Sequence, residues 1–127
     1  MRNDPKTIAL EYIEAVGRKE FGKLDELLAP DLQFKGPAMS SSRAQDFVSA
    51  LKRIGTVLVR NEVKKAFVGG SEVCLIYDFV TDTPVGTVPT VEWLRVEDGR
   101  IRSVWLLFDR QPWPAVMEEV ARRAGRR

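Results

Sequence analysis

The first half of the chain carries apolar residues at helical spacing. Asp4 followed by Pro5 predicts a helix start, because a capping side chain precedes a proline at the first helical position. The apolar stripe behind it extends this helix over residues 5–17. Residues 20–29 predict a second, short helix, which Pro30 ends because proline restricts the residue before it.

A short strand and a third helix complete this half. Residues 32–35 alternate between apolar and polar side chains, as a strand does. Ser42 and Gln45 form a capping-box pattern ahead of an apolar helical stripe over residues 47–54. Gly55 then ends the predicted helix.

The second half changes to the two-residue period of β-strands. Asp98-Gly99 is a tight hairpin signal between the last two of these strands. The period predicts strands over residues 57–68, 73–80, 89–96 and 101–108.

Helices followed by a strand meander predict an α+β fold in a single domain over residues 1–127. We expect a core over about residues 5–113 and a C-terminal amphipathic helix over about residues 113–124, introduced by Pro112 and Pro114. The N-terminal helices are expected to pack on one face of a curved mixed or antiparallel sheet and to enclose an apolar pocket.

The strands are apolar on both faces, so both faces need a cover. Trp93, Trp105 and Leu107 share one face of the last two strands and lie opposite to Glu92 and Leu94. We expect the two tryptophans to pack against a second subunit, which makes a homodimer through the outer sheet face the expected assembly.

Composition narrows the class of partner. An apolar fraction of 44% allows a packed core, and the net charge of +2 is close to neutral. The basic cluster Arg122, Arg123, Arg126 and Arg127 contains no interleaved aromatic residue, so we expect a solvated helix end and no nucleic-acid partner. The sequence has neither an 18-residue apolar run nor a signal-peptide core, so we expect no membrane partner and a cytoplasmic location.

The reactive residue types exclude several chemistries. The sequence contains no histidine, which excludes Ser-His-Asp and Cys-His catalysis and histidine-ligated metal sites. Cys74 is the single cysteine, which excludes an intramolecular disulfide. A single cysteine is consistent with a protein in a reducing compartment. Cys74 lies in an apolar strand, where we expect it to act as a small hydrophobic residue. We expect neither a metal nor a cofactor.

Two polar residues interrupt otherwise apolar patterns. Tyr12 lies in the middle of the first helix, and Glu92 lies in the strand over residues 89–96. If both face one cavity, burial raises the pKa of the carboxyl group, and the neutral acid and the phenol can both donate hydrogen bonds to a developing enolate. Strand parity is expected to bring Ile76 and Asp78 to the same cavity, with Asp78 as the candidate base.

The remaining lining is expected to be apolar, with Asp109 at the mouth as a candidate ligand contact. Alternatives stay open for the polar residues: Tyr12 as a buried tyrosine bonded to a backbone carbonyl, Glu92 as a structural partner of a neighbouring side chain, Asp78 facing water, and Asp109 capping a loop. The apolar candidates for substrate binding are Phe34, Met39, Phe47, Leu51, Cys74, Ile76, Leu94, Val104 and Leu106.

Four stretches resemble the nuclear transport factor 2-like superfamily, in its SnoaL-like branch of small cone-shaped domains. They are residues 11–16, 28–32, 93–101 and 107–109, and the resemblance covers about residues 8–113. It implies a cone that encloses a pocket. It says little about activity, because the superfamily includes isomerases, cyclases, dehydratases, epoxide hydrolases and binding proteins without catalysis.

Comparison with two enzyme branches is more discriminating. In a ketosteroid isomerase, Tyr12 falls at the oxyanion tyrosine and Glu92 at the second oxyanion donor, but the general base expected directly before Pro37 is Gly36 here. The resemblance therefore does not imply a standard ketosteroid isomerase.

Limonene epoxide hydrolases match less well. Asp78 falls at one catalytic aspartate position, whereas Ile76 and Leu106 replace the expected arginine and second aspartate. A limonene epoxide hydrolase is therefore not implied either.

The leading hypothesis is a homodimeric SnoaL-like protein that binds a small hydrophobic molecule with a carbonyl or phenol group. Its catalytic form is a cofactor-free acid–base isomerase, cyclase or dehydratase, with Tyr12 and Glu92 as the oxyanion pair. The alternative is a non-catalytic binding or dimerisation module of the same fold.

Overall fold

The computed structural model describes residues 4–125. Its centre is a six-stranded sheet with the strand order β2-β1-β6-β5-β4-β3. The strands are β1 (Leu28–Lys35), β2 (Ser40–Ser41), β3 (Leu58–Gly69), β4 (Glu72–Thr81), β5 (Thr87–Glu97) and β6 (Arg100–Phe108). The helices are α1 (Pro5–Gly17), α2 (Leu24–Leu27), α3 (Ala44–Ile54) and α4 (Trp113–Ala124), with a 3-10 turn, η1 (Phe21–Lys23).

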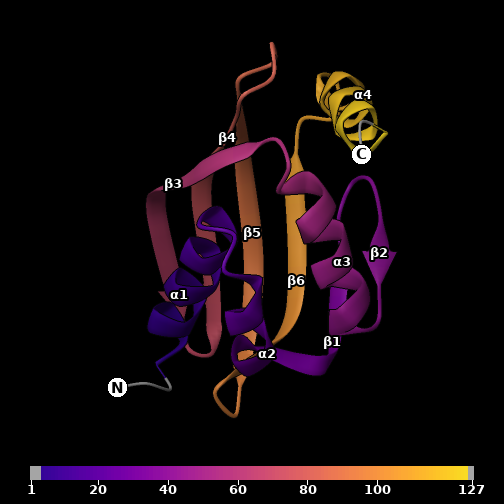
Figure 1. Cartoon of the computed structure of the whole chain (residues 1–127). Helices are drawn as coiled ribbons and strands as arrows, with labels where there is room; N and C mark the ends of the chain where they lie inside the picture. The colour runs from indigo at the N-terminus through magenta and orange to yellow at the C-terminus, as the bar shows by residue number, and fades with distance from the viewer. Residues whose placement is uncertain (1–3, 126–127) are drawn as a thin grey trace.

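The sheet is mixed and carries its helices on one face. β1 runs parallel to β6, and every other strand pair is antiparallel. Figure 1 shows α1 in front of the β3 half of the sheet, α3 in front of the β1 half, and α4 beyond the end of β6. This arrangement confirms the expected α+β fold with helices on a curved mixed sheet.

The start of α1 follows its sequence signal. The Asp4 Oδ2 atom accepts a hydrogen bond from the Thr7 backbone N–H at 3.2 Å, and Pro5 occupies the first helical turn. The stripe with helical spacing then turns toward the sheet and buries Ile8, Tyr12 and Val16. Tyr12 therefore reaches the core because it lies one turn beyond Ile8 on the same helix face.

Two local predictions in the first half are wrong. The second helix is only a 3-10 turn followed by one helical turn, and Pro30 lies inside β1. The β1–β6 register shifts between Leu28 and Gln33, so Pro30 occupies an irregular stretch that tolerates its missing N–H. The capping box is also wrong: Arg43 is the N-cap residue of α3 and forms an ion pair with Asp46 at 2.9 Å.

The parity expected for β4 is wrong as well. Directly opposed residues of antiparallel strands share a face, and Glu92 lies opposite Leu75 while Thr90 lies opposite Tyr77. Tyr77 therefore shares the inner face with Glu92, whereas Ile76 and Asp78 lie on the outer face.

The parity expected for β5 and β6 is confirmed. Glu92 pairs with Leu106 on the inner face, and Trp93 pairs with Trp105 on the outer face. The inner-face residues pack with α1 and α3 into the main core, while a smaller cluster of Val57, Val116 and Val120 holds α4. Within residues 4–125, no helix is long and apolar enough to cross a membrane.

Candidate functional site

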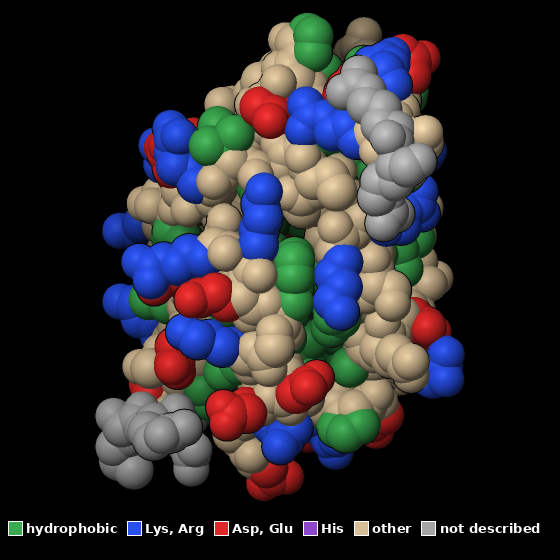
Figure 2. Space-filling view, in the orientation of Figure 1, with side chains coloured by type: hydrophobic (Ala, Val, Ile, Leu, Met, Phe, Trp, Pro, Cys, Tyr) green, Lys and Arg blue, Asp and Glu red, His purple; other side chains and the backbone are tan. Residues whose placement is uncertain are grey.

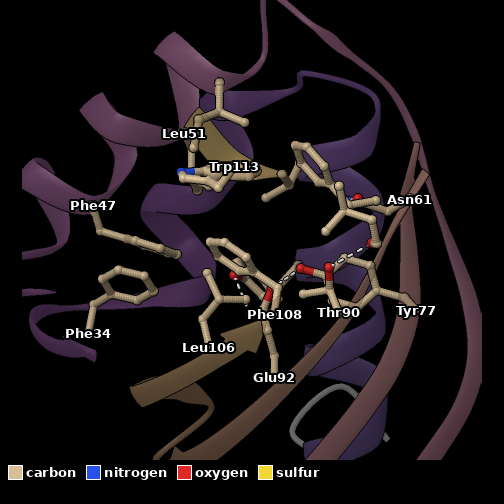
Figure 3. A pocket seen from close by; sticks show the side chains of 15 residues that line it. Phe34, Phe47, Leu51, Asn61, Tyr77, Thr90, Glu92, Leu106, Phe108 and Trp113 are labelled. Carbon is tan, nitrogen blue, oxygen red and sulfur yellow. Dashed lines mark hydrogen bonds between the residues drawn. The ribbon is translucent and has the colours of Figure 1, made fainter. Parts of the chain in front are cut away.

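A cavity of about 60 Å³ lies between the helices and the inner face of the sheet. Figure 3 shows the side chains that line it, with Phe34 and Phe47 on one side and Asn61 and Tyr77 on the other. Its polar lining residues are Tyr12, Asn61, Tyr77, Thr90 and Glu92. Its apolar lining residues are Val16, Phe34, Phe47, Leu51, Ile54, Phe79, Val88, Leu106, Phe108 and Trp113.

A buried carboxyl group with two phenol partners is the main polar feature of this cavity. The Tyr12 hydroxyl donates a hydrogen bond to Glu92 Oε1 at 2.7 Å, and the Tyr77 hydroxyl donates to Glu92 Oε2. Glu92 and Tyr77 are each 4% exposed, and Tyr12 is buried even more completely. We call Tyr12, Glu92 and Tyr77 the carboxyl–phenol cluster. It joins α1, β5 and β4 at one point.

Burial controls the protonation of this cluster. It raises the pKa of Glu92 above the usual glutamate value, and the hydrogen bonds from Tyr77 and Tyr12 offset part of that rise. The pKa values of Tyr12 and Tyr77 are raised well above the ordinary phenol value, first by burial and then by the negative charge of Glu92. The phenols therefore keep their protons, and Glu92 is the group that titrates.

A proton count then shows what the cluster can bind. When Glu92 is ionised, both phenol protons are engaged by the carboxylate, so the cluster offers only acceptor lone pairs to a ligand. When Glu92 is protonated, one additional O–H is present and one donor remains for a ligand oxygen. The first state suits a ligand hydroxyl group. The second suits a carbonyl oxygen or an oxyanion.

A second, larger pocket of about 220 Å³ adjoins the cavity on the side of α3 and α4. The two spaces are separated by shared side chains, among them two aromatic pairs. The ring centroids of Phe34 and Phe47 lie 4.5 Å apart, as do those of Phe108 and Trp113. We call these four side chains the aromatic partition. Met39 and Met117 line only the outer pocket.

The volumes limit how a ligand can be placed. A cavity that accepts benzene measures about 150 Å³, so the inner cavity alone is too small for an aromatic ring. The outer pocket has room for a ring, and the polar cluster lies beyond the aromatic partition. A ring whose oxygen reaches Glu92 must therefore extend through the partition between the two spaces.

Gly36, where a base is absent, packs closely against the Phe34 ring. A Cβ atom on Gly36 would lie 3.0 Å from Phe34 Cζ, tighter than nine in ten real Cβ contacts. A side chain at this position would therefore require the Phe34 ring, which packs against Phe47, to move by a few tenths of an ångström. The glycine and the aromatic partition are therefore linked features of this pocket.

The residues expected at the site separate into two groups. Tyr12 and Glu92 meet in the cavity, and Met39 lines the outer pocket. Leu94 and Val104 are buried in the core but do not line either space. The expected apolar residues that line the inner cavity are Phe34, Phe47, Leu51 and Leu106.

Four expected residues lie elsewhere. Cys74 lies opposite Trp93 on the outer face and lines neither space. Asp78 is on the outer face, where Lys64 Nζ lies 3.5 Å from its carboxylate, so Asp78 is not the base of this cavity. Ile76 is exposed on the same face. Asp109 is exposed and its Oδ1 accepts a hydrogen bond from the Gln111 backbone N–H at 3.0 Å, the loop-capping alternative.

Sequence reasoning did not find Tyr77, Thr90 and Asn61 in the cavity lining. The alternation in β4 places Tyr77 on the same face as Leu75 and Phe79. This pattern fits an inner face as well as an outer one, so it did not show that Tyr77 points inward. The wrong parity removed it from consideration. Thr90 and Asn61 follow from the register alone, since Thr90 opposes Tyr77 and Asn61 opposes Phe79.

The surface over the helices carries charges of both signs. Figure 2 shows Lys and Arg side chains interleaved with Asp and Glu side chains on this face. Within residues 4–125, no three His, Cys, Asp or Glu side chains gather in a position to hold a metal ion. Two arginines of the predicted basic cluster, Arg126 and Arg127, lie outside the described residues.

Comparison with known proteins supports the fold independently. A structure from Kribbella flavida shares 29% identity over 88% of this chain and 92% of its own, with a TM-score of 0.80. An NTF2-like protein of unknown function from Cytophaga hutchinsonii shares 24% identity over 87% and 94%, with a TM-score of 0.76. A steroid delta-isomerase from Pseudomonas aeruginosa shares 20% identity over 95% and 91%, with a TM-score of 0.76.

A search of curated proteins found no significant match. At 20% identity, the likeness to the steroid isomerase concerns the fold alone. The sequence-family model of the SnoaL-like domain matches residues 9–104, which is most of the chain. The chain therefore belongs to the SnoaL-like domain family, and it shares the fold of an NTF2-like protein.

Proposed function

We propose that this protein binds a small, mostly apolar molecule through one carbonyl or phenol oxygen. The observation that carries the proposal is the buried Glu92 carboxyl group, held by Tyr12 and Tyr77 in an otherwise apolar cavity. Binding sites for small molecules combine an apolar lining with a few placed polar groups. The ligand ring lies across the aromatic partition, and its oxygen contacts the carboxyl–phenol cluster.

The catalytic form of this proposal depends on Glu92. Among the described residues, it is the only carboxyl group that lines the inner cavity. A buried carboxyl group with a pKa raised by burial is suited to donate and accept a proton in a dry cavity. Isomerisation, cyclisation or dehydration without a cofactor would therefore use Glu92 as the proton carrier, and a protein that only binds the ligand would not need that transfer.

Binding is tested by calorimetric titration of the wild type with 2-naphthol. Tyr12→Phe removes a phenol hydroxyl group, and Glu92→Gln replaces one carboxyl oxygen with an NH2 donor. Each change disrupts the cluster, so each should weaken binding by about 1–3 kcal/mol. Asp78→Asn is the matched control, because Asp78 lies on the outer face and should leave affinity unchanged.

Circular dichroism establishes that the variants fold. Equal affinity in the wild type, Tyr12→Phe and Glu92→Gln would refute the role of the cluster. No binding of 2-naphthol to the wild type would favour the alternative of a dimerisation module with a structural carboxyl–phenol cluster.

We also propose that a second copy of the chain covers the outer sheet face. Trp93 and Trp105 stack there with ring centroids 5.6 Å apart, and each is more than 40% exposed. Charges of both signs surround them, including Lys35 and Arg95 beside Glu72. A face with apolar residues and both charge signs can complement its own copy about a two-fold axis.

A further inference from the structure

Asn61 places an amide group in the lining of the inner cavity. It lies on β3 opposite Phe79, so its side chain shares the inner face with the carboxyl–phenol cluster. Figure 3 shows it on the side of the cavity away from Phe34 and Phe47. A ligand that enters from the outer pocket and passes the aromatic partition approaches this side last.

The orientation of the Asn61 amide follows from its hydrogen bond. Its Nδ2 donates to the Ile13 backbone carbonyl at 3.2 Å. The reversed amide would bring two carbonyl oxygens together, so the oxygen must be the atom directed away from Ile13. That oxygen, Asn61 Oδ1, is buried and receives no hydrogen bond from any described residue.

The other polar groups of the cavity lining already have partners. Tyr12 and Tyr77 donate to Glu92, and the Thr90 hydroxyl donates to the Val88 carbonyl at 2.9 Å. Among the described lining residues, Asn61 Oδ1 is thus the one buried side-chain polar atom without any hydrogen-bond partner. Buried acceptors in proteins nearly always receive a hydrogen bond, from the protein, from water or from a ligand.

We infer that Asn61 is a specificity-determining residue that accepts a hydrogen bond from a hydroxyl or N–H group of the ligand. This inference rests on the proposed function, because the same ligand places its oxygen on the carboxyl–phenol cluster. The ligand class becomes narrower: an apolar scaffold with two polar groups, of which the one at Asn61 is a hydrogen-bond donor.

The sheet geometry indicates how far apart these two groups are. β3 and β5 are separated by β4, and Asn61 is in register with Val88, which lies four residues from Glu92 along β5. The two backbone positions therefore lie roughly 10 Å apart across the sheet and roughly 13 Å apart along it. Two substituents on a single small ring do not span such a separation, and a fused two-ring scaffold with one hydroxyl group on each ring reaches further.

Calorimetry with naphthalene-2,6-diol and naphthalene-2,7-diol, each compared with its monomethyl ether, tests this inference. The ether keeps the scaffold and one hydroxyl but lacks the second donor. In the wild type, at least one diol should bind about five- to tenfold more tightly than its ether, as expected for a donor paired with a buried acceptor. In Asn61→Leu, which has similar volume and no acceptor, this ratio should fall to about one.

Tyr12→Phe separates the two proposals. It should weaken the diol and its ether alike and leave their ratio unchanged, since it acts on the shared oxygen. Equal affinities of diols and ethers in the wild type, as expected if water satisfies Asn61, would overturn the inference while the proposed function stands. A preference that survives in Asn61→Leu would also overturn it.

Two further outcomes are decisive. If none of the diols, ethers or 2-naphthol binds the wild type, both proposals fail together. If Asn61→Leu does not fold, as judged by circular dichroism, the comparison of diol and ether in the wild type decides by itself.

Discussion

Glu92 is a carboxyl group whose two oxygens each receive a phenol hydrogen bond inside an apolar cavity. Burial disfavours its ionised form, and the two donors favour it, with burial the larger effect. The position therefore tolerates a charge only at a cost to folding. A glutamate in such surroundings is more readily explained by ligand chemistry than by stability, since an apolar residue would pack there without that cost.

This balance predicts the pH dependence of stability. The pKa of Glu92 is higher in the folded than in the unfolded protein, so the folded state binds more protons between the two values. The Glu92 contribution is therefore fully present below the unfolded value of about 4.3 and is lost as the pH rises through the raised folded pKa.

Urea unfolding from pH 4 to 8 measures this effect. The free energy of unfolding of the wild type should fall with pH more steeply than that of Glu92→Gln, which has no group to titrate at this position. Parallel curves for the two proteins would show that Glu92 has no raised pKa in the folded state.

At the scale of elements, α4 encloses the outer pocket together with α3. Trp113 and Met117 of α4 line the outer pocket. Arg123 connects α4 to the rest of the chain, because its Nη2 lies 2.7 Å from Asp82 Oδ1 in the β4–β5 loop. Arg122, one residue earlier, forms its ion pairs with Glu118 and Glu119 of the same helix.

Arg123→Gln should loosen α4 and speed both association and dissociation of 2-naphthol in stopped-flow experiments, with little change in affinity. Arg122→Gln is the matched control, because it removes an arginine without removing a connection between elements. Equal rates for the two variants would mean that α4 does not limit access.

At the scale of the whole molecule, the helices lie on one face of the sheet and the outer face carries none of them (Figure 1). Its exposed apolar side chains are those of Phe67, Ile76, Trp93, Trp105 and Leu107. Exposed apolar patches of this kind mark interaction surfaces. The proposed homodimer would leave the cavity, which lies on the other side of the sheet, open to ligand.

Trp105→Glu should convert the dimer to a monomer in sedimentation velocity experiments, because a charge would be buried without a partner in the interface. Val68→Glu serves as the control. Val68 is also exposed but opposes Val73 on the inner side of the sheet. A wild type that sediments as a monomer would contradict the dimer.

The sequence alone determined most elements and two members of the cluster. The helical stripe placed Tyr12 toward the core, and the alternation in β5 placed Glu92 on the inner face, because each was a polar residue in a pattern with one apolar side. The hairpin at Asp98-Gly99 was equally local, since both residues adopt positive φ there.

Only the tertiary structure decided the third member and the size of the site. Both faces of β4 carry apolar side chains, so its sequence does not show which face points inward. The register with β5 places Tyr77 on the inner face, beside Glu92, and Asp78 on the outer face. The free oxygen of Asn61 and the aromatic partition likewise depend on side chains that come together from α1, α3, α4 and several strands. Local patterns specify periodicity, whereas a cavity is the space left when distant elements pack, and only that packing determines its volume and its lining.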